Sequence, residues 1–426
     1  MGRVAYPPPM TALTAPPLSL YVHFPWCVRK CPYCDFNSYT LSGELPAAAY
    51  VERLARDLEA QAPGVAGRAV VSVFFGGGTP SLFSPAWVAR VLEAARRHLA
   101  LDSDAEVTLE ANPGAIERGA FREYRDAGVT RVSLGAQSFA PEALAALGRI
   151  HSPAETRRAA EELHAAGLTN FNLDLMYALP GQTRAGALGD LEAALALAPA
   201  HLSHYQLTLE PGTVFAAHPP ALPDEDEAAA QLEECAALLA AADFGHYEVS
   251  AYARAGRECR HNLNYWNFGD YLGVGAGAHG KLTLPERAQI VRTVQPREPR
   301  RYLAAAPGEL VRQVVPAQDL PFEFMLNALR LTRGFALDEF VARTGLQASS
   351  IAAPLARLLG RGLLERTAEG YRPSRLGLRF LNDLLTDFLP ESPEMPGAFA
   401  LSIARAGGAQ DRLRSLFTGA ESATGE

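Results

Sequence analysis

The chain has 426 residues, 48% of them hydrophobic, which is enough for a large domain and a smaller one. A formal net charge of -8 argues against broad binding to a nucleic-acid backbone, which requires a basic surface. No apolar run reaches the roughly 18 residues of a membrane-spanning helix, although peripheral membrane contact stays compatible with the sequence.

The N-terminal stretch, residues 1–17, is rich in proline and lacks the basic and then apolar pattern of a signal peptide. We therefore expect a flexible lead-in. We also expect a cytoplasmic protein, because cysteines stay reduced in that compartment.

A strand is predicted over residues 18–24, and three of the five cysteines follow it at the spacing C-x3-C-x2-C. The thiolates of Cys27, Cys31 and Cys34 can hold three irons of a 4Fe–4S cluster and leave the fourth iron open to a small molecule. A zinc site usually needs four ligands in closed pairs, and no second pair lies nearby. A disulfide is disfavoured in a chain without a signal peptide.

Strands and helices then alternate along the chain. The patterns predict strands over 69–75, 106–110, 131–134, 171–175 and 201–207, and helices over 46–61, 84–98, 116–127, 152–166, 185–197 and 225–242. With the first strand this makes six strands separated by helices, which indicates an α/β fold with a parallel sheet. An open doubly wound sheet and a partial barrel both fit this alternation.

The polar residues distinguish these two folds. They lie at or just past the ends of different strands: the cysteine loop, residues 76–79, Glu110, Gln137 and Asp174. A barrel assembles its site from the ends of several strands, whereas an open sheet concentrates ligand groups at one switch point. We therefore predict a partial (β/α)6 barrel over residues 18–250, with the active site at this rim.

The chain changes character after residue 250. Residues 251–320 form an extension rich in aromatic residues and glycine, in which 285–306 is expected to be a connection. Residues 321–388 carry helices at 336–344 and 349–359, a hairpin at 363–373 and a last helix at 374–388, the outline of a small α+β winged-helix-like domain. A helix that reads DNA should be basic, but the helix at 349–359 has a single basic residue, Arg357. We therefore expect a structural domain or a substrate lid rather than a DNA-binding domain. Residues 389–426 are expected to be ordered only in part.

Several motifs carry chemistry only in context. The glycine turn at 76–80 is typical of any tight turn, but glycines also let the backbone approach a ligand closely. Glu110 could bind a ribose or an amine, and Arg149 could pair with a carboxylate. Taken one at a time, each of these residues could equally be structural. Because they lie at the ends of successive strands, however, we favour one shared site.

The remaining cysteines and the aromatic stretch are weaker signals. Cys235 is expected in the core, and Cys259 is assigned no role because no partner thiolate is near it in sequence. The stretch HNLNYW at 261–266 sets a histidine beside flat apolar rings, which would suit an iron-bearing macrocycle. A buried aromatic cluster with a hydrogen-bonded histidine is the simpler interpretation.

In combination these stretches resemble the HemN/HemW group of radical SAM proteins from about residue 18 to 388. The motifs that carry the resemblance are YVHFPWC (21–27), CPYCDF (31–36), FGGGTPS (75–81), EANP (110–113), DLMY (174–177), LPGQT (179–183), YLG (271–273) and GAGAHG (275–280). The resemblance implies a partial barrel with a small C-terminal domain, and a 4Fe–4S cluster whose open iron binds S-adenosylmethionine (SAM). Reduction of bound SAM gives a 5′-deoxyadenosyl radical.

Two subfamilies are separated by their motifs. HemN proteins, oxygen-independent coproporphyrinogen III dehydrogenases, carry a fourth cysteine where this chain has Phe36. HemW proteins carry HNxxYW, which is associated with heme binding and is matched by His261, Asn262, Tyr265 and Trp266. The resemblance therefore implies a heme chaperone that receives electrons from a donor and passes heme to respiratory-chain apoproteins. One departure is Ala178, where the family usually has glycine, and it puts the turn there in question.

The resemblance also implies which residues contact SAM. These are Tyr21, Tyr33, Gly77, Gly78, Thr79, Glu110, Gln137, Arg149, Asp174 and Thr208. The alternative function is the oxidative decarboxylation of coproporphyrinogen III, which Phe36 and HNxxYW disfavour. A transcription regulator is disfavoured by the acidic charge. The sequence leaves open the acceptor protein and the formation of a homodimer.

Overall fold

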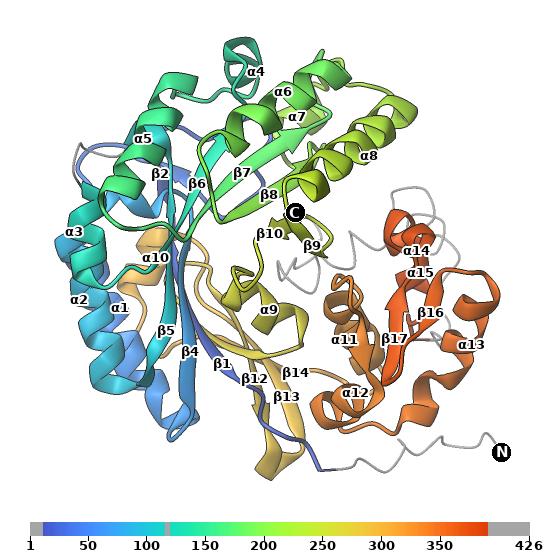
Figure 1. Cartoon of the computed structure of the whole chain (residues 1–426). Coiled ribbons are helices and arrows are strands. Elements are labelled where there is room, and N and C mark those ends of the chain that lie inside the picture. Colours follow the sequence, from blue (N-terminus) through green and yellow to red (C-terminus); the bar gives the residue numbers. More distant parts are fainter. Residues whose placement is uncertain (1–11, 116–119, 391–426) are drawn as a thin grey trace, which may run out of the picture.

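The computed structural model describes residues 12–115 and 120–390 (Figure 1). The expected tail from residue 391 and the lead-in up to residue 11 lie outside the described residues, as do residues 116–119 of the predicted helix 116–127. Residues 12–17 are not a free lead-in. Leu13 is buried in the core of the C-terminal domain, and the Thr14 backbone N–H donates to the Ala342 carbonyl at 3.0 Å.

The centre of the molecule is one sheet of 12 strands. Its parallel part consists of neighbouring strands in the order β1 (Leu18–Phe24), β4 (Ala69–Gly77), β5 (Ala100–Ala111), β6 (Arg131–Gln137), β7 (Phe171–Tyr177) and β8 (His201–Gln206). β1 and β7 are each buried at six of their seven residues, because helices or loops cover both faces of the sheet. The predicted alternation of six strands with helices is confirmed.

The connecting helices cover the outer face of this sheet (Figure 1). They are α1 (Ala47–Gln61), α2 (Pro85–His98), α3 (Ala120–Ala127), α4 (Pro141–Ala146), α5 (Pro153–Ala165), α6 (Arg184–Leu195) and α8 (Glu225–Ala241). The short α7 (Val214–Ala217) lies against the cysteine loop instead, where the Phe215 N–H donates to the Pro32 carbonyl at 3.0 Å. A capping box begins α5, with the Ser152 N–H donating to Glu155 Oε2 at 2.7 Å. Single 3-10 turns lie at Ala62–Val65, Pro80–Leu82, Pro113–Ala115, Pro285–Arg287 and Ala348–Ile351.

Residues 251–320 extend the same sheet on both sides. β10 (Ala251–Ala253) pairs with β8 and with β9 (Gly245–Glu248), whereas β11 (Asp270–Val274) lies parallel to β1. β12 (His279–Leu284), β13 (Gln289–Val294) and β14 (Val311–Val314) continue antiparallel. The expectation of a plain connection over 285–306 is wrong, because β13 pairs along its whole length with β12 and α10 (Pro299–Ala304) follows it. On the face opposite the outer helices, α9 (Arg260–Trp266) contacts β1, β4 and β11 (Figure 1).

A buried ion cluster joins the extension to the parallel strands. Asp270 of β11 is fully buried and accepts a hydrogen bond from Lys281 Nζ at 2.8 Å and from the Thr283 backbone N–H at 2.7 Å. Arg68 approaches the same carboxylate at 2.9 Å. Because Lys281 is 2% exposed, each of these charges depends on the others, and removing one would leave a buried unpaired ion.

The C-terminal domain lies beside α9 as a separate lobe (Figure 1). It contains α11 (Leu320–Ala328), α12 (Leu337–Thr344), α13 (Ala352–Gly360), α14 (Arg375–Arg379) and α15 (Leu381–Thr386), with a sheet of β15 (Phe335–Ala336), β17 (Gly370–Pro373) and β16 (Leu364–Arg366). The predicted helix over 374–388 is wrong in one respect, because it breaks at Phe380 into α14 and α15. The lobe packs around its own apolar core.

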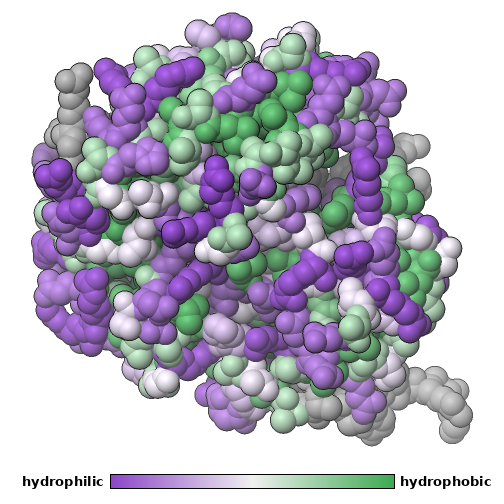
Figure 2. Space-filling model, in the orientation of Figure 1, coloured by the Kyte–Doolittle hydropathy of each residue, from purple (hydrophilic) through white to green (hydrophobic). Residues whose placement is uncertain are grey.

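The surface seen in Figure 2 is mainly hydrophilic, with hydrophobic side chains gathered towards the top of the view around α6 and α7. Within the described ranges, no helix combines the length and the apolar character that crossing a bilayer requires.

Candidate cofactor site

The cysteine loop is closed by its own backbone and by one lysine. It begins at β2 (Trp26–Cys27), which pairs in parallel with β3 (Tyr39–Thr40). Lys30 Nζ donates to the carbonyls of Phe36 and Ser38, both at 3.0 Å. These contacts hold the loop in a fixed shape, so that its three half-buried cysteines line one cavity of about 780 Å³, the first cavity.

The thiols lie in surroundings that suit metal ligation. Burial raises the pKa of the Cys27 and Cys34 thiols, so loading a metal would release protons from this loop. Arg149 Nη1 lies 3.6 Å from Cys31 Sγ, where its charge stabilises an electron-rich sulfur. Three sulfur ligands on one loop, a cation beside them and open space in front fit an iron–sulfur cluster with one open iron.

The glycine turn packs directly on the strand that leads into the cysteine loop. Gly77 has φ +113°, a conformation that favours glycine, and a Cβ at Gly78 would lie 2.6 Å from the Trp26 carbonyl oxygen. The Gly78 N–H donates to the Phe24 carbonyl at 2.7 Å, and the Thr79 N–H donates to the Trp26 carbonyl at 2.8 Å. The glycines are therefore required for packing, and the turn they form lines the first cavity.

Two carboxyl groups face the first cavity from β5 and β7, the strands on either side of β6. Glu110 of β5 accepts a hydrogen bond from the Gly77 N–H at 3.1 Å, and Asp174 of β7 accepts one from Asn172 Nδ2 at 2.8 Å. Burial, and then the charge of Asp174, raise the pKa of Glu110 to about 8. Burial also raises the pKa of Asp174. A ligand with an amine or sulfonium cation would relieve this repulsion.

Gln137 ends β6 with φ +66°, which is unusual for a residue other than glycine. Its Oε1 accepts a hydrogen bond from Tyr205 OH at 2.8 Å, so the side chain is held at the cavity wall. Arg149 Nη2 donates to the Gly135 carbonyl at 2.9 Å, while within the described part of the chain its buried Nε finds no hydrogen-bond acceptor. Such an orphaned donor fits a site that completes its hydrogen bonds with a ligand.

Most of the predicted SAM contacts meet at this cavity. The lining includes Tyr33, Gly77, Gly78, Thr79, Glu110, Gln137, Arg149, Asp174 and Thr208. Tyr21 is different, because it lines a second cavity and its OH lies 2.7 Å from His23 Nδ1. His23 Nε2 in turn lies 2.9 Å from the Asn37 carbonyl oxygen, so this pair supports the end of the cysteine loop.

The second cavity has a volume of about 510 Å³ and adjoins the first. Both cavities are lined by Asp35, Phe36, Gly77, Glu110 and Trp266. The second is further lined by aromatic and cationic side chains, among them Tyr265, Tyr271, His279, Arg292 and Arg297. The last three were not among the site residues predicted from the sequence. The motif GAGAHG was a signal for His279, but the two arginines carried none.

The HNxxYW residues divide between the two cavities. Asn262 lines the first, Tyr265 lines the second and Trp266 lines both. His261 is 5% exposed and lines neither. Its ring stacks on Phe74 at 4.2 Å between centroids. This position agrees with the simpler interpretation of the stretch, a buried histidine in an aromatic cluster, and a heme-ligand role for His261 would require the ring to leave its packing.

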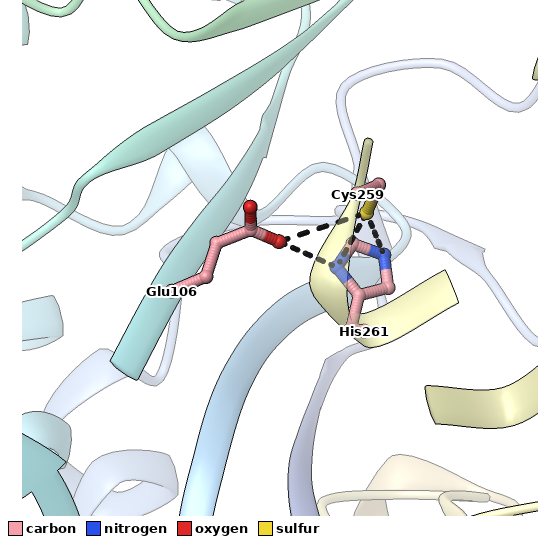
Figure 3. A group of neighbouring side chains, drawn as sticks. All are labelled: Glu106, Cys259 and His261. Carbon is pink, nitrogen blue, oxygen red and sulfur yellow. Dashed lines mark hydrogen bonds and ion pairs between the residues drawn. The ribbon is translucent and has the colours of Figure 1, made fainter. Parts of the chain in front are cut away.

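Figure 3 shows what holds His261. Its Nδ1 lies 3.1 Å from Cys259 Sγ and 3.8 Å from Glu106 Oε1. Burial opposes ionisation, but the hydrogen bond from His261 and the charge of the buried Arg131 hold the pKa of Glu106 below its ordinary value. These three side chains are close enough to share a metal ion, but Arg131 already compensates the carboxylate. We therefore treat the group as a buried polar cluster.

The C-terminal domain supports the wall between the cavities. The guanidinium of Arg330 lies 4.3 Å from the centre of the Trp266 ring and pairs with Glu248 at 3.1 Å. Arg292 of the second cavity forms an ion pair with Glu323 of α11. The two predicted roles, a structural domain and a substrate lid, both stay predictions.

Comparisons with known proteins agree with the motifs. The Radical SAM superfamily matches residues 21–194, and the HemN C-terminal domain matches residues 315–380. The chain is 49% identical to heme chaperone HemW of Escherichia coli K12, covering 88% of this chain and 99% of that protein. It is 44% identical to heme chaperone HemW of Haemophilus influenzae, with the same coverage.

A solved structure agrees with the fold. Coproporphyrinogen III oxidase HemN of Escherichia coli, a radical SAM enzyme, superposes with a TM-score of 0.75 at 24% identity, covering 90% of this chain and 91% of its own. At that identity the similarity concerns the fold alone. The identity to the two HemW proteins extends over nearly their whole length, and the chain therefore belongs to the HemW family of radical SAM proteins.

Proposed function

We propose that this protein is a heme chaperone that binds a 4Fe–4S cluster, SAM and heme, and delivers the heme to respiratory-chain apoproteins. The observation that carries the proposal is the 49% identity to a heme chaperone along the whole of that relative. The two adjoining cavities add support, because they offer separate spaces for a polar cosubstrate and a flat apolar ligand. We expect the protein to act in the cytoplasm, with an electron donor for the cluster.

In the first cavity, Cys27, Cys31 and Cys34 would hold the cluster, which supplies an open iron and an electron when bound. Glu110 and Asp174 would then face the positive charge of SAM. Arg149, beside Cys31, would stabilise the sulfur ligand and pair with the cosubstrate's carboxylate.

Coproporphyrinogen oxidation is the second candidate, because the chain resembles the HemN/HemW group and carries a HemN C-terminal domain. Phe36 stands where HemN proteins have their fourth cysteine and is 59% exposed beside both cavities. The cysteine loop thus presents an apolar ring at that place instead of another thiol.

The test is anaerobic titration of the cluster-loaded protein with heme, followed by its visible spectrum. The heme-loaded protein is then mixed with a heme-free b-type cytochrome. We expect saturable one-to-one binding and transfer of heme to the cytochrome. Absence of specific binding, together with turnover of coproporphyrinogen III, would replace the chaperone with the dehydrogenase.

A further inference from the structure

The walls of the second cavity combine flat rings with cations. Tyr21 and Tyr271 come from neighbouring strands, and Tyr265 and Trp266 come from α9. Phe36 of the cysteine loop adds a further, solvent-exposed ring. Aromatic faces of this kind bind a flat conjugated ligand by stacking and apolar contact. A volume of about 510 Å³ is within the range of small-molecule cavities.

Arginines lie on one side of this cavity. Arg292 of β13 and Arg297 just beyond that strand both line it, and Arg297 is exposed. Arg297 Nε donates to Asn37 Oδ1 at 3.1 Å, which directs the guanidinium towards the cysteine loop. An exposed guanidinium at the edge of an apolar cavity suits a ligand whose carboxylates stay near water.

Two histidines line the second cavity in the described chain, His23 and His279. The two ring nitrogens of His23 lie 2.7 Å from Tyr21 OH and 2.9 Å from the Asn37 carbonyl oxygen, so this ring supports the cysteine loop. His279 begins β12, directly across from Val294 of β13. His279 lines the cavity beside its aromatic and arginine side chains, and an imidazole nitrogen is a common iron ligand in heme proteins.

We infer that the second cavity is the heme site, with His279 as the iron ligand and Arg297 pairing with a propionate at the mouth. This inference rests on the proposed function and differs from the sequence prediction in the ligand, since His261 lines neither cavity. Heme bound there would lie against Trp266 and Glu110, two of the five residues that also line the first cavity. The cosubstrate site and the heme site would thus be neighbours that share one wall.

The experiment compares the cluster-loaded wild type with His279→Ala. Ferric heme is titrated anaerobically, and the iron ligation is followed by the visible spectrum and electron paramagnetic resonance. We expect the affinity of His279→Ala for heme to fall about tenfold or more and the ligation signature to change. Added imidazole should restore that signature, whereas binding of iron-free protoporphyrin IX should stay the same. His218→Ala, at an exposed histidine outside both cavities, is the matched control.

A second variant keeps the test valid if His279→Ala folds poorly. Arg297→Gln should weaken heme binding several-fold but leave binding of the heme dimethyl ester, which lacks carboxylates, unchanged. Arg300→Gln, at another exposed arginine, is its control.

The outcomes separate the inference from the proposed function. If wild type binds and delivers heme while His279→Ala retains both the affinity and the ligation signature, the inference is wrong and the function stands. If wild type binds no heme, the proposed function fails and the inference fails with it.

Discussion

The two cavities are built from different kinds of structure although they share a wall. The first is lined at the ends of parallel strands by residues that follow one another in recognisable motifs. The second is lined by side chains along β1, β4, β12 and β13 and by α9, taken one or two at a time. Polar groups concentrated at strand ends suit a charged cosubstrate, and rings spread along a sheet suit a flat apolar ligand. The two can therefore be disabled separately.

The largest expected separation comes from Cys31→Ser. We expect the variant to lose the cluster, because only two of the three cysteine ligands remain. SAM binding that depends on the cluster should be lost with it. Heme affinity should fall by less than about threefold, a difference of under about 0.7 kcal/mol. Iron and sulfide analysis and heme titration measure the two effects. Equal loss of heme binding would mean that the cavities form one site.

A smaller effect on the same cavity is expected from Glu110→Gln. The folded-state pKa of Glu110, about 8, is above the ordinary value of about 4.3, so the folded protein binds more protons between these values. The contribution of this carboxyl to stability is therefore intact below about pH 4.3 and is lost as the pH rises towards about 8. Because glutamine does not ionise, the stability of Glu110→Gln should not fall in this way as the pH rises. The variant should also bind SAM about tenfold more weakly or worse.

Thermal unfolding of the cofactor-free proteins at about pH 5 and about pH 8 tests this prediction. The unfolding midpoint of wild type should fall more over this interval than that of Glu110→Gln. Glu123→Gln changes an exposed carboxylate on α3 and is the control. Parallel pH profiles for wild type and Glu110→Gln would contradict the burial of this charge.

The difference between the cavities also explains what could be predicted from the sequence. The parallel strands, the cysteine loop and the residues after each strand were predictable because parallel strands bring their ends to one edge. Nine of the ten SAM residues that the family resemblance implies line the first cavity; Glu110 and Gln137 reach it from the ends of their strands, whereas Tyr33 comes from the cysteine loop. Tyr21 is the exception, since a strand alternates its side chains and the local pattern does not say which cavity each face meets.

The second cavity could not be predicted in this way. His279 and Arg292 meet there only because β12 and β13 form a hairpin, and the chain after Pro285 was interpreted as a connection. The aromatic neighbours of His261 in sequence made it a candidate ligand, beside the simpler interpretation of a buried histidine. Its actual neighbours, Phe74 and Glu106, are more than a hundred residues away in the chain. In both cases the surroundings of the histidine are set by residues that are distant in sequence, which local patterns do not reveal.

The shared wall provides a weaker perturbation. In Arg330→Gln the cation over the Trp266 ring is lost, a contact worth about 0.5–1 kcal/mol. Because Trp266 lines both cavities, we expect the SAM and heme affinities to fall together by about two- to fivefold. Calorimetric titration with SAM and spectral titration with heme measure this, with the exposed Arg379→Gln as control. Loss at one cavity only would argue against a common wall.

The smallest expected effect concerns the one departure from the family motifs. Ala178 follows β7 at φ +55°, and the left-handed conformation costs a residue with a Cβ about 1–2 kcal/mol. Ala178→Gly should therefore raise the free energy of unfolding by up to about 1 kcal/mol, after the extra entropy of glycine in the unfolded chain is subtracted. Ala185→Gly in the first turn of α6 should lower it by about 1 kcal/mol. Denaturant unfolding measures both, and destabilisation by Ala178→Gly would mean that the alanine methyl group contributes more by packing than its backbone strain costs.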